Sequence, residues 1–220
     1  MFRYVKPLDI PNLTSVTQPN GKRYYTLPNG KVVPSVTTVI GAKQKQSIIE
    51  WRKRVGEEEA NRISRQAASR GTNTHKLIEN YLNNESLGRN VMPDAKKMFV
   101  DLKPLLNNIN NIHYQEQSLW SDKIEMAGRV DCIGEYNGVL SIIDFKTSKK
   151  VKKKEDIPEY FAQCTAYALM YEELVGNPID QLVVLMAVND SPPLVFIEKT
   201  EDHINNLLDY IKFYRKSVAN

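Results

Sequence analysis

Residues 128–150 read GRVDCIGEYNGVLSIIDFKTSKK, and this stretch decides the fold. Apolar runs on either side surround Asn137-Gly138, the dipeptide that most strongly favours a two-residue type I′ turn. The stretch therefore predicts a β-hairpin, and the turn fixes its register by pairing Tyr136 with Val139.

The hairpin contains two aspartates within its apolar runs. Counting back from the turn places Asp131 directly opposite Asp144, and Lys146 follows on the same face of the sheet. Facing carboxylates repel, and their burial is costly. A divalent cation such as Mg²⁺ or Mn²⁺, which prefers oxygen ligands, offsets both effects. The alternative is an ion pair between one aspartate and Lys146 or Arg129 at the end of the sheet.

Three further groups of polar residues point to the same place. Glu116 lies on the strand before the hairpin and would add a third carboxylate, unless it is an ordinary solvated strand residue. Gln163 and Tyr167 are four residues apart and share one helix face, as do His75 and Glu79. Each of these pairs has an alternative interpretation as ordinary helix residues without a ligand.

The pattern along the chain predicts an α/β fold with a mixed central sheet flanked by helices. Asn29-Gly30 predicts a small hairpin near the N-terminus. Helical composition covers about 47–68, Gly71 interrupts it, and further helices are expected at 74–82 and from Pro93. The expected elements after that are strands 114–120, 124–136 and 139–147, a helix 158–176, strands 181–189 and 194–199, and a helix 201–217.

A chain of 220 residues with 41% hydrophobic residues is long enough for one sizeable core, so we expect a single domain. Within it we distinguish an N-terminal hairpin arm (1–46), a helical region (47–110) and a core (111–220). The formal net charge of +4 permits a polyanionic partner without requiring one.

Cysteine content and hydropathy exclude several classes of protein. Cys132 and Cys164 are too few for a four-cysteine zinc or iron-sulfur site, so we expect two reduced thiols in the core. No segment approaches the roughly 20 apolar residues of a membrane span, and the start of the chain has no signal-peptide pattern. We therefore expect no membrane association and a reducing compartment.

These motifs, in this order, resemble the PD-(D/E)XK nuclease superfamily and its RecB-like branch. The resemblance rests on Gly128-x-x-Asp131, the thirteen-residue step to Asp144-Phe145-Lys146, and Gln163-x-x-x-Tyr167. The chain is most similar to the mitochondrial genome maintenance exonuclease group with its phage and bacterial relatives. That group also has a PSVT start to its first helix (34–37 here), a Gly71-x-x-x-His75 helix and a hairpin like residues 131–148.

The resemblance implies a restriction-endonuclease-like core with a catalytic Mg²⁺ or Mn²⁺ ion. Its ligands would be Asp131, Asp144, the backbone carbonyl of Phe145 and His75, with Glu116 as a further candidate.

The resemblance also implies catalytic roles for three more residues. Lys146 would orient or activate the attacking water and stabilise charge on the scissile phosphate. Gln163 and Tyr167 would position the DNA strand or Lys146.

Several basic and hydroxyl residues are candidates for DNA contacts. A lysine-rich segment follows the hairpin, and its alternative role is a solvated loop that keeps the surface soluble. The expected DNA-binding residues are Thr147, Ser148, Lys149, Lys150, Lys152, Lys153, Lys154 and Arg70. Trp51, Tyr81 and Tyr160 would either stack on unpaired bases or belong to the core.

The function implied by the resemblance is a metal-dependent exonuclease that hydrolyses single-stranded or flap DNA from free ends. The alternatives are a structure-specific endonuclease and a catalytically weak DNA-end-binding module of a replication or recombination complex. Relatives with an iron-sulfur cluster have four cysteines in the nuclease core, so no cluster is expected here. No transit peptide is evident, and we expect a cytoplasmic protein encoded by a bacterium or a phage.

Overall fold

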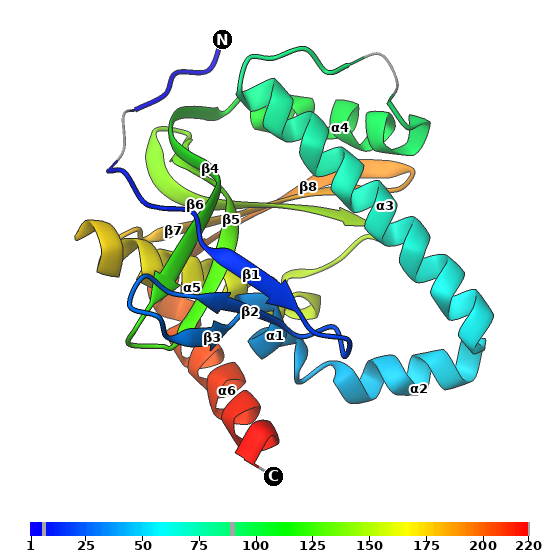
Figure 1. Cartoon of the computed structure of the whole chain (residues 1–220). Helices are drawn as coiled ribbons and strands as arrows, with labels where there is room; N and C mark the ends of the chain where they lie inside the picture. Colours follow the sequence, from blue (N-terminus) through cyan, green and yellow to red (C-terminus); the bar gives the residue numbers. More distant parts are fainter. Residues whose placement is uncertain (6–7, 89–90, 220) are drawn as a thin grey trace.

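A five-stranded mixed sheet forms the centre of the molecule (Figure 1). The computed structural model describes residues 1–5, 8–88 and 91–219. The strand order is β4-β5-β6-β7-β8, and only β6 and β7 are parallel. The strands span β4 (Ile109–Ser121), β5 (Met126–Tyr136), β6 (Val139–Ser148), β7 (Gln181–Val188) and β8 (Ser191–Lys199).

Helices cover both faces of this sheet. On one face lie α5 (Pro158–Val175), which connects β6 to β7, and α6 (Thr200–Ala219). On the other lie α3 (Glu57–Leu82) and α4 (Pro93–Leu106). None of the helices in the described ranges combines the length and the apolar character of a membrane span.

Two hydrophobic cores result, one on each face of the sheet. Ile142 and Val184 belong to the core beneath α5 and α6, while their neighbours Ile143 and Val183 belong to the core beneath α3 and α4. Strands buried on both faces are apolar along their whole length, which explains the continuous runs in β6 and β7. Asp144, in the middle of β6, is therefore 2% exposed and needs a buried partner.

A small N-terminal sheet packs against the β4–β5 hairpin. It consists of β1 (Thr14–Thr17), β2 (Arg23–Thr26) and β3 (Val32–Pro34), followed by the short helix α1 (Val36–Gly41). The predicted hairpin at Asn29-Gly30 is confirmed as β2–β3, whereas β1 was not predicted.

The predicted helix break at Gly71 is wrong. The chain breaks at Gly56, between α2 (Lys45–Val55) and α3, where φ is +87°. Only glycine adopts this backbone conformation at low cost, whereas a glycine inside a helix costs only about 1 kcal/mol. Burial of Leu77 and Ile78 offsets that smaller cost, so α3 continues through Gly71.

The other expected elements are close to those observed. Helix α5 begins at Pro158 and ends before Gly176, whose φ of +78° stops it as predicted. The meander β4–β5–β6 is confirmed. Strand β8 begins at Ser191, three residues earlier than expected, because it is an edge strand that accommodates Pro192 and Pro193.

The two glycines give opposite predictions for stability. Gly56→Ala should destabilise the protein by about 1–3 kcal/mol because of its backbone conformation. Gly71→Ala should stabilise it by about 0.5–1 kcal/mol, since the nearest atom to a new Cβ, Thr147 Oγ1, is at 3.9 Å. Urea unfolding of both variants measures the two changes. A neutral Gly56→Ala together with a destabilising Gly71→Ala would contradict the observed break.

Candidate active site

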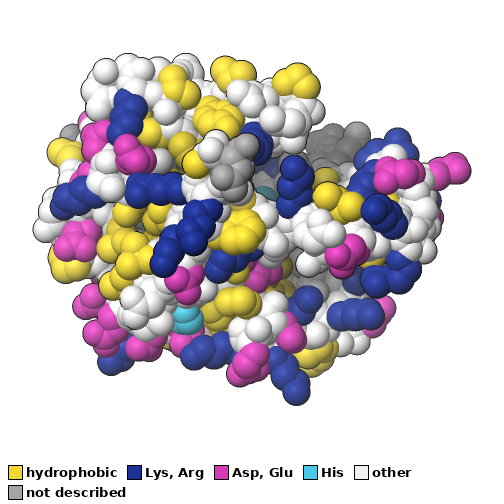
Figure 2. Space-filling view, turned by 90° about the horizontal axis from the view of Figure 1, so that it is seen from below, with side chains coloured by type: hydrophobic (Ala, Val, Ile, Leu, Met, Phe, Trp, Pro, Cys, Tyr) yellow, Lys and Arg dark blue, Asp and Glu magenta, His cyan; other side chains and the backbone are white. Residues whose placement is uncertain are grey.

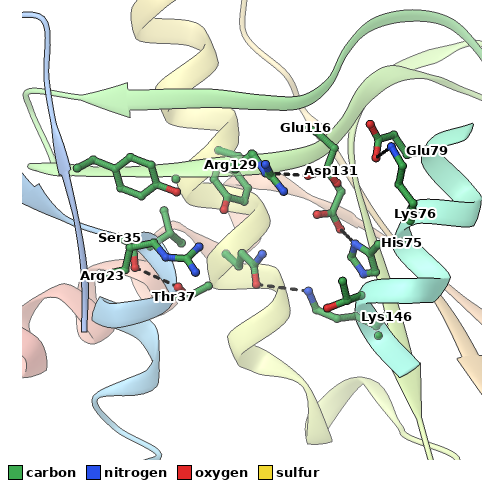
Figure 3. A pocket seen from close by; sticks show the side chains of 17 residues that line it. Arg23, Ser35, Thr37, His75, Lys76, Glu79, Glu116, Arg129, Asp131 and Lys146 are labelled. Carbon is green, nitrogen blue, oxygen red and sulfur yellow. Dashed lines mark hydrogen bonds and ion pairs between the residues drawn. The ribbon is translucent and has the colours of Figure 1, made fainter. Parts of the chain in front are cut away.

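A cavity of about 450 Å³ opens where the central sheet meets α3, α5 and the N-terminal sheet (Figure 3). This volume is in the range of ordinary ligand sites. The cavity brings together six of the residues expected to bind metal or take part in catalysis, from α3, β4, β5, β6 and α5. They are His75, Glu116, Asp131, Lys146, Gln163 and Tyr167.

Three of these side chains form a cluster able to hold a metal ion. One ligand atom from each of His75, Glu116 and Asp131 lies within 4.8 Å of the other two. Glu116 and Asp131 come together because the residues on either side of them are paired, Gln115 with Cys132 and Gln117 with Val130, in the β4–β5 register. Helix α3 supplies His75, whose Nδ1 is 3.7 Å from Asp131 Oδ2.

The backbone at Glu116 is strained. Its φ of +49° is unusual for a non-glycine residue and typically costs about 1–3 kcal/mol. The side chain is mostly buried and forms an ion pair at 2.7 Å with Arg129 Nε. Burial, followed by the nearby Asp131 charge, raises the pKa of Glu116. The fold thus holds two carboxylates together at a cost that a cation would offset.

Asp144 lies outside this cluster, in a buried ion pair with Lys146. Lys146 Nζ is 2.6 Å from Asp144 Oδ2 and donates a hydrogen bond of 2.8 Å to Oδ1. Gln163 Nε2 also donates to Asp144 Oδ1, at 3.1 Å. Burial lowers the pKa of Lys146, but attraction to Asp144 and then Asp131 outweighs it, so the pKa is raised and the ammonium stays protonated. This is the ion pair that the sequence left open as an alternative.

The predicted direct pairing of Asp131 with Asp144 needs correction. The hairpin register is as predicted from Tyr136↔Val139 to Cys132↔Ile143, where the ladder of paired residues ends. Beyond that point the Asp131 side chain accepts the backbone N–H of Phe145, at 2.9 Å. The Asp131 carboxylate thus accepts a hydrogen bond that a backbone carbonyl of β5 would accept if the ladder continued.

The Phe145 carbonyl contacts His75. His75 Nε2 lies 2.7 Å from this carbonyl, and a hydrogen bond to it requires the proton on Nε2. In the neutral ring, Nδ1 is then an acceptor directed towards Asp131, which is the arrangement typical of metal-binding histidines. Here the carbonyl orients His75, in contrast to the ligand role implied by the resemblance.

Gly128 makes room for Tyr167. A Cβ at position 128 would lie 2.8 Å from Tyr167 Oη and 3.1 Å from Val36 Cγ2. Tyr167 is 2% exposed, and burial raises the pKa of its hydroxyl well above the usual value, so it stays neutral. The glycine of the Gly-x-x-Asp motif is therefore a packing requirement of the site.

The expected DNA-binding residues lie outside the lining of this cavity. Lys149, Lys150 and Lys153 are exposed on the segment after β6, and Lys154 forms an ion pair with Glu198 at 2.5 Å. Lys152 is partly exposed, as are Thr147 and Ser148, and the Ser148 hydroxyl donates to the Lys150 carbonyl. Arg70 is only 8% exposed on α3.

Two of the three aromatic candidates have structural contacts. Tyr81 packs edge-on against Phe2 and Phe99, as expected of a residue in the core. Tyr160 is close to the cavity, with Lys146 Nζ 5.0 Å from its ring centre. Trp51 is partly exposed on α2.

Sequence reasoning missed one wall of the cavity. Arg23, Ser35 and Thr37 line it from β2 and the start of α1 (Figure 3). The PSVT stretch was the only signal for this wall, and nothing pointed to Arg23. Overall charge does not reveal it either, since Figure 2 shows Lys and Arg spread over one face with Asp and Glu among them.

The sequence and the fold agree with a known superfamily. Residues 98–215 match the sequence profile of the PD-(D/E)XK nuclease superfamily, and the chain belongs to it. A crystal structure of a candidate exonuclease from Eubacterium rectale superposes with a TM-score of 0.50 at 13% identity. This match covers 70% of the present chain and 66% of the other, and it shows similarity of fold.

The curated relatives that the chain matches belong to the group that its sequence resembles. Mitochondrial genome maintenance exonuclease 1 of Homo sapiens is 28% identical over 168 residues, covering 72% of this chain and 44% of the human protein. The Xenopus tropicalis protein of the same name is 25% identical over 211 residues, covering 85% and 60%. The chain thus spans about half the length of these relatives. Its expected bacterial or phage origin stays a prediction.

The residues present fit the divalent metal that nucleases of this superfamily use. One imidazole nitrogen and two carboxylates are suitable donors for such an ion, and the hydrogen bond to Phe145 already orients the imidazole. Burial and then the charge of Asp131 raise the pKa of Glu116, and a bound cation would offset both effects.

We predict that Gly128→Ala lowers the free energy of unfolding by about 1–3 kcal/mol, because the new methyl overlaps Tyr167. Urea unfolding measures the loss. In a Tyr167→Ala background the same substitution should cost clearly less, because the two residues are coupled. Equal costs in both backgrounds would show that the overlap is not the cause.

We predict that Glu116→Gln changes stability in opposite directions with and without metal. In EDTA at pH 8 the variant should be the more stable protein, because the raised pKa means that folding disfavours the charged carboxylate above that pKa. With Mn²⁺ at a hundred times its dissociation constant, the wild type should gain about 2.7 kcal/mol and the variant much less.

Glu79→Gln is the matched control, since Glu79 lines the cavity outside the cluster. Urea unfolding with and without Mn²⁺ gives all the values. An equal gain in wild type and Glu116→Gln would remove Glu116 from the set of ligands.

Proposed function

We propose that this protein is a Mg²⁺- or Mn²⁺-dependent deoxyribonuclease that hydrolyses single-stranded or flap DNA from free ends. The observation that carries the proposal is the location of the His75–Glu116–Asp131 cluster in one cavity with the protonated Lys146. Membership of a nuclease superfamily supports it, and the exonuclease names of the curated relatives motivate the preference for free ends.

The metal would be held by His75, Glu116 and Asp131, with Asp144 as a fourth candidate. When bound, such an ion acidifies a coordinated water and neutralises charge on the phosphate. The Phe145 carbonyl keeps His75 in the orientation and tautomer that this role needs.

Lys146 acts as a hydrogen-bond donor and a positive charge. Its raised pKa keeps it protonated, so it is poorly suited to remove a proton from water. An ammonium at the edge of the cavity instead donates to a phosphate oxygen and stabilises the negative charge that develops during hydrolysis.

Gln163 and Tyr167 position these groups. The Gln163 amide donates to Asp144, and its oxygen lies 3.5 Å from Lys146 Nζ, so it fixes the ion pair from the α5 side. Tyr167 fills the space beside Gly128 and limits how far a substrate penetrates the cavity.

The segment after β6 would guide the DNA backbone towards the cavity. Its exposed lysines supply electrostatic attraction that does not depend on base sequence. Thr147 and Ser148 lie between these lysines and Lys146, where they would contact the same strand. Arg70 would contribute only through the small part of its side chain that is exposed. Replication or recombination proteins are the partners expected for an enzyme of this kind, acting in the cytoplasm.

The proposal is tested with two end-labelled substrates in Mg²⁺ or Mn²⁺, a linear single-stranded DNA and a covalently closed single-stranded circle. We expect cleavage of the linear strand only, and none in EDTA. Asp131→Asn, which keeps an acceptor for the Phe145 N–H, and Lys146→Ala should each lower the rate by about 100-fold or more.

Asp209→Asn is the control for loss of one carboxylate, since Asp209 is exposed on α6. Thermal melting verifies that each variant is folded. Cleavage of the circle would identify an endonuclease, and tight DNA binding without any cleavage would identify an end-binding module.

A further inference from the structure

Arg23 faces the metal cluster from the opposite wall of the cavity. In Figure 3, Arg23, Ser35 and Thr37 lie on one side, and His75, Asp131 and Lys146 lie on the other. The cavity thus has a wall rich in carboxylates and a second wall, formed by the N-terminal sheet and α1, whose only charged group among the described residues is Arg23.

Arg23 differs from the other cations of the cavity in its partners. Each of the others forms an ion pair with a carboxylate: Lys76 with Glu79 at 3.0 Å, Arg129 with Glu116 at 2.7 Å and Lys146 with Asp144 at 2.6 Å. Within the described ranges, Arg23 has no carboxylate within 4.0 Å. Its Nε donates to Thr17 Oγ1 at 3.3 Å, and its two terminal nitrogens have no partner in those ranges.

The backbone of Arg23 is nevertheless held firmly. Its N–H donates to Thr38 Oγ1 at 2.9 Å, and its carbonyl accepts from the Ser35 N–H at 2.8 Å and from the Thr38 hydroxyl at 3.2 Å. Ser35 of the PSVT stretch and Thr38, directly after that stretch, therefore anchor the backbone of the arginine. Because the backbone is already fixed and Nε is held at Thr17, only the rest of the side chain has to be ordered when a ligand binds.

We propose that Arg23 binds a backbone phosphate of the DNA strand, other than the phosphate that lies at Lys146. A guanidinium presents paired donors that match two phosphate oxygens, and the absence of a competing carboxylate leaves them available. The exposed Thr37 hydroxyl lies on the same wall, where it is hydrogen-bonded to Ser35 Oγ at 3.0 Å. Two fixed phosphates determine which linkage reaches the metal cluster. This inference rests on the proposed nuclease function.

The phosphate at Arg23 has two possible sources, an internal linkage and a phosphorylated 5′ end. Oligonucleotides with a 5′-phosphate and with a 5′-hydroxyl distinguish them. If Arg23→Ala weakens binding equally for both, the phosphate is internal. A loss confined to the 5′-phosphorylated strand identifies the terminal group.

The first measurement is DNA binding without metal. Fluorescence anisotropy in EDTA at several salt concentrations should show that Arg23→Ala binds roughly 10- to 100-fold more weakly than wild type. The slope of log K against log salt should fall by about 0.7, as expected for one phosphate contact on a single strand. Arg23→Lys should recover part of the affinity because it keeps the charge and loses the paired donors.

Lys22→Ala is the matched control. It removes one positive charge from the adjacent residue, which does not line the cavity. We expect little change in its affinity. Arg23→Ala should remain as stable as wild type because only the exposed side chain changes.

The second measurement is a scan of cleavage with single neutral methylphosphonate linkages. In wild type, a methylphosphonate at one particular linkage, distinct from the cleaved one, should reduce kcat/KM, because that linkage no longer binds Arg23. In Arg23→Ala the same linkage should carry no penalty, whereas in Lys22→Ala the penalty should persist.

These results separate the inference from the proposed function. Cleavage by wild type, with Arg23→Ala indistinguishable from Lys22→Ala in both measurements, would overturn the phosphate site and leave the nuclease intact. Arg23-dependent binding without any cleavage by wild type would support the phosphate site and refute the nuclease.

Discussion

The buried ion pair between Asp144 and Lys146 is the constraint around which the site is organised. Strand β6 lies inside the sheet with a hydrophobic core on each face, so the Asp144 carboxylate has almost no access to water. Removing one member of such a pair leaves an uncompensated charge, which typically costs about 3–5 kcal/mol. The pair ends the apolar part of β6 and provides a fixed, charged edge against which α5 places Gln163.

Around this pair, two of the proposed metal ligands are restrained by contacts to the backbone of another strand. Asp131 accepts from Phe145, and His75 interacts with the carbonyl of the same residue, so one peptide segment of β6 orients groups from β5 and α3. Glu116 is placed by an unfavourable backbone conformation of its own. The carboxylates are thus held together by the fold before any ion binds, and a cation would lower the free energy of an arrangement already present.

Much of this arrangement was predictable from local chemistry. The Asn137-Gly138 turn set the register of the hairpin, and Pro158 and Gly176 set the limits of α5. The left-handed conformation of Glu116 and the choice of Gly56 over Gly71 as the break depend on tertiary packing, which composition does not report. Arg23 escaped notice because its neighbours across the cavity, from His75 to Lys146, are distant in sequence, with no pattern linking them to it.

Helix α3 consists of a C-terminal half that is packed against a core and an N-terminal half that is mostly exposed. Its C-terminal half is anchored in a core through Leu77, Ile78 and Leu82. In its first half, Ala60 is the one buried apolar residue among those described. None of the described residues of α2 is buried. The elbow formed by α2 and the start of α3 is therefore held mainly by its own helical hydrogen bonds. It is a low-stability unit that can bend or unwind without disturbing either core, while His75, which lies in the anchored half of α3, stays in place with the cluster of ligands.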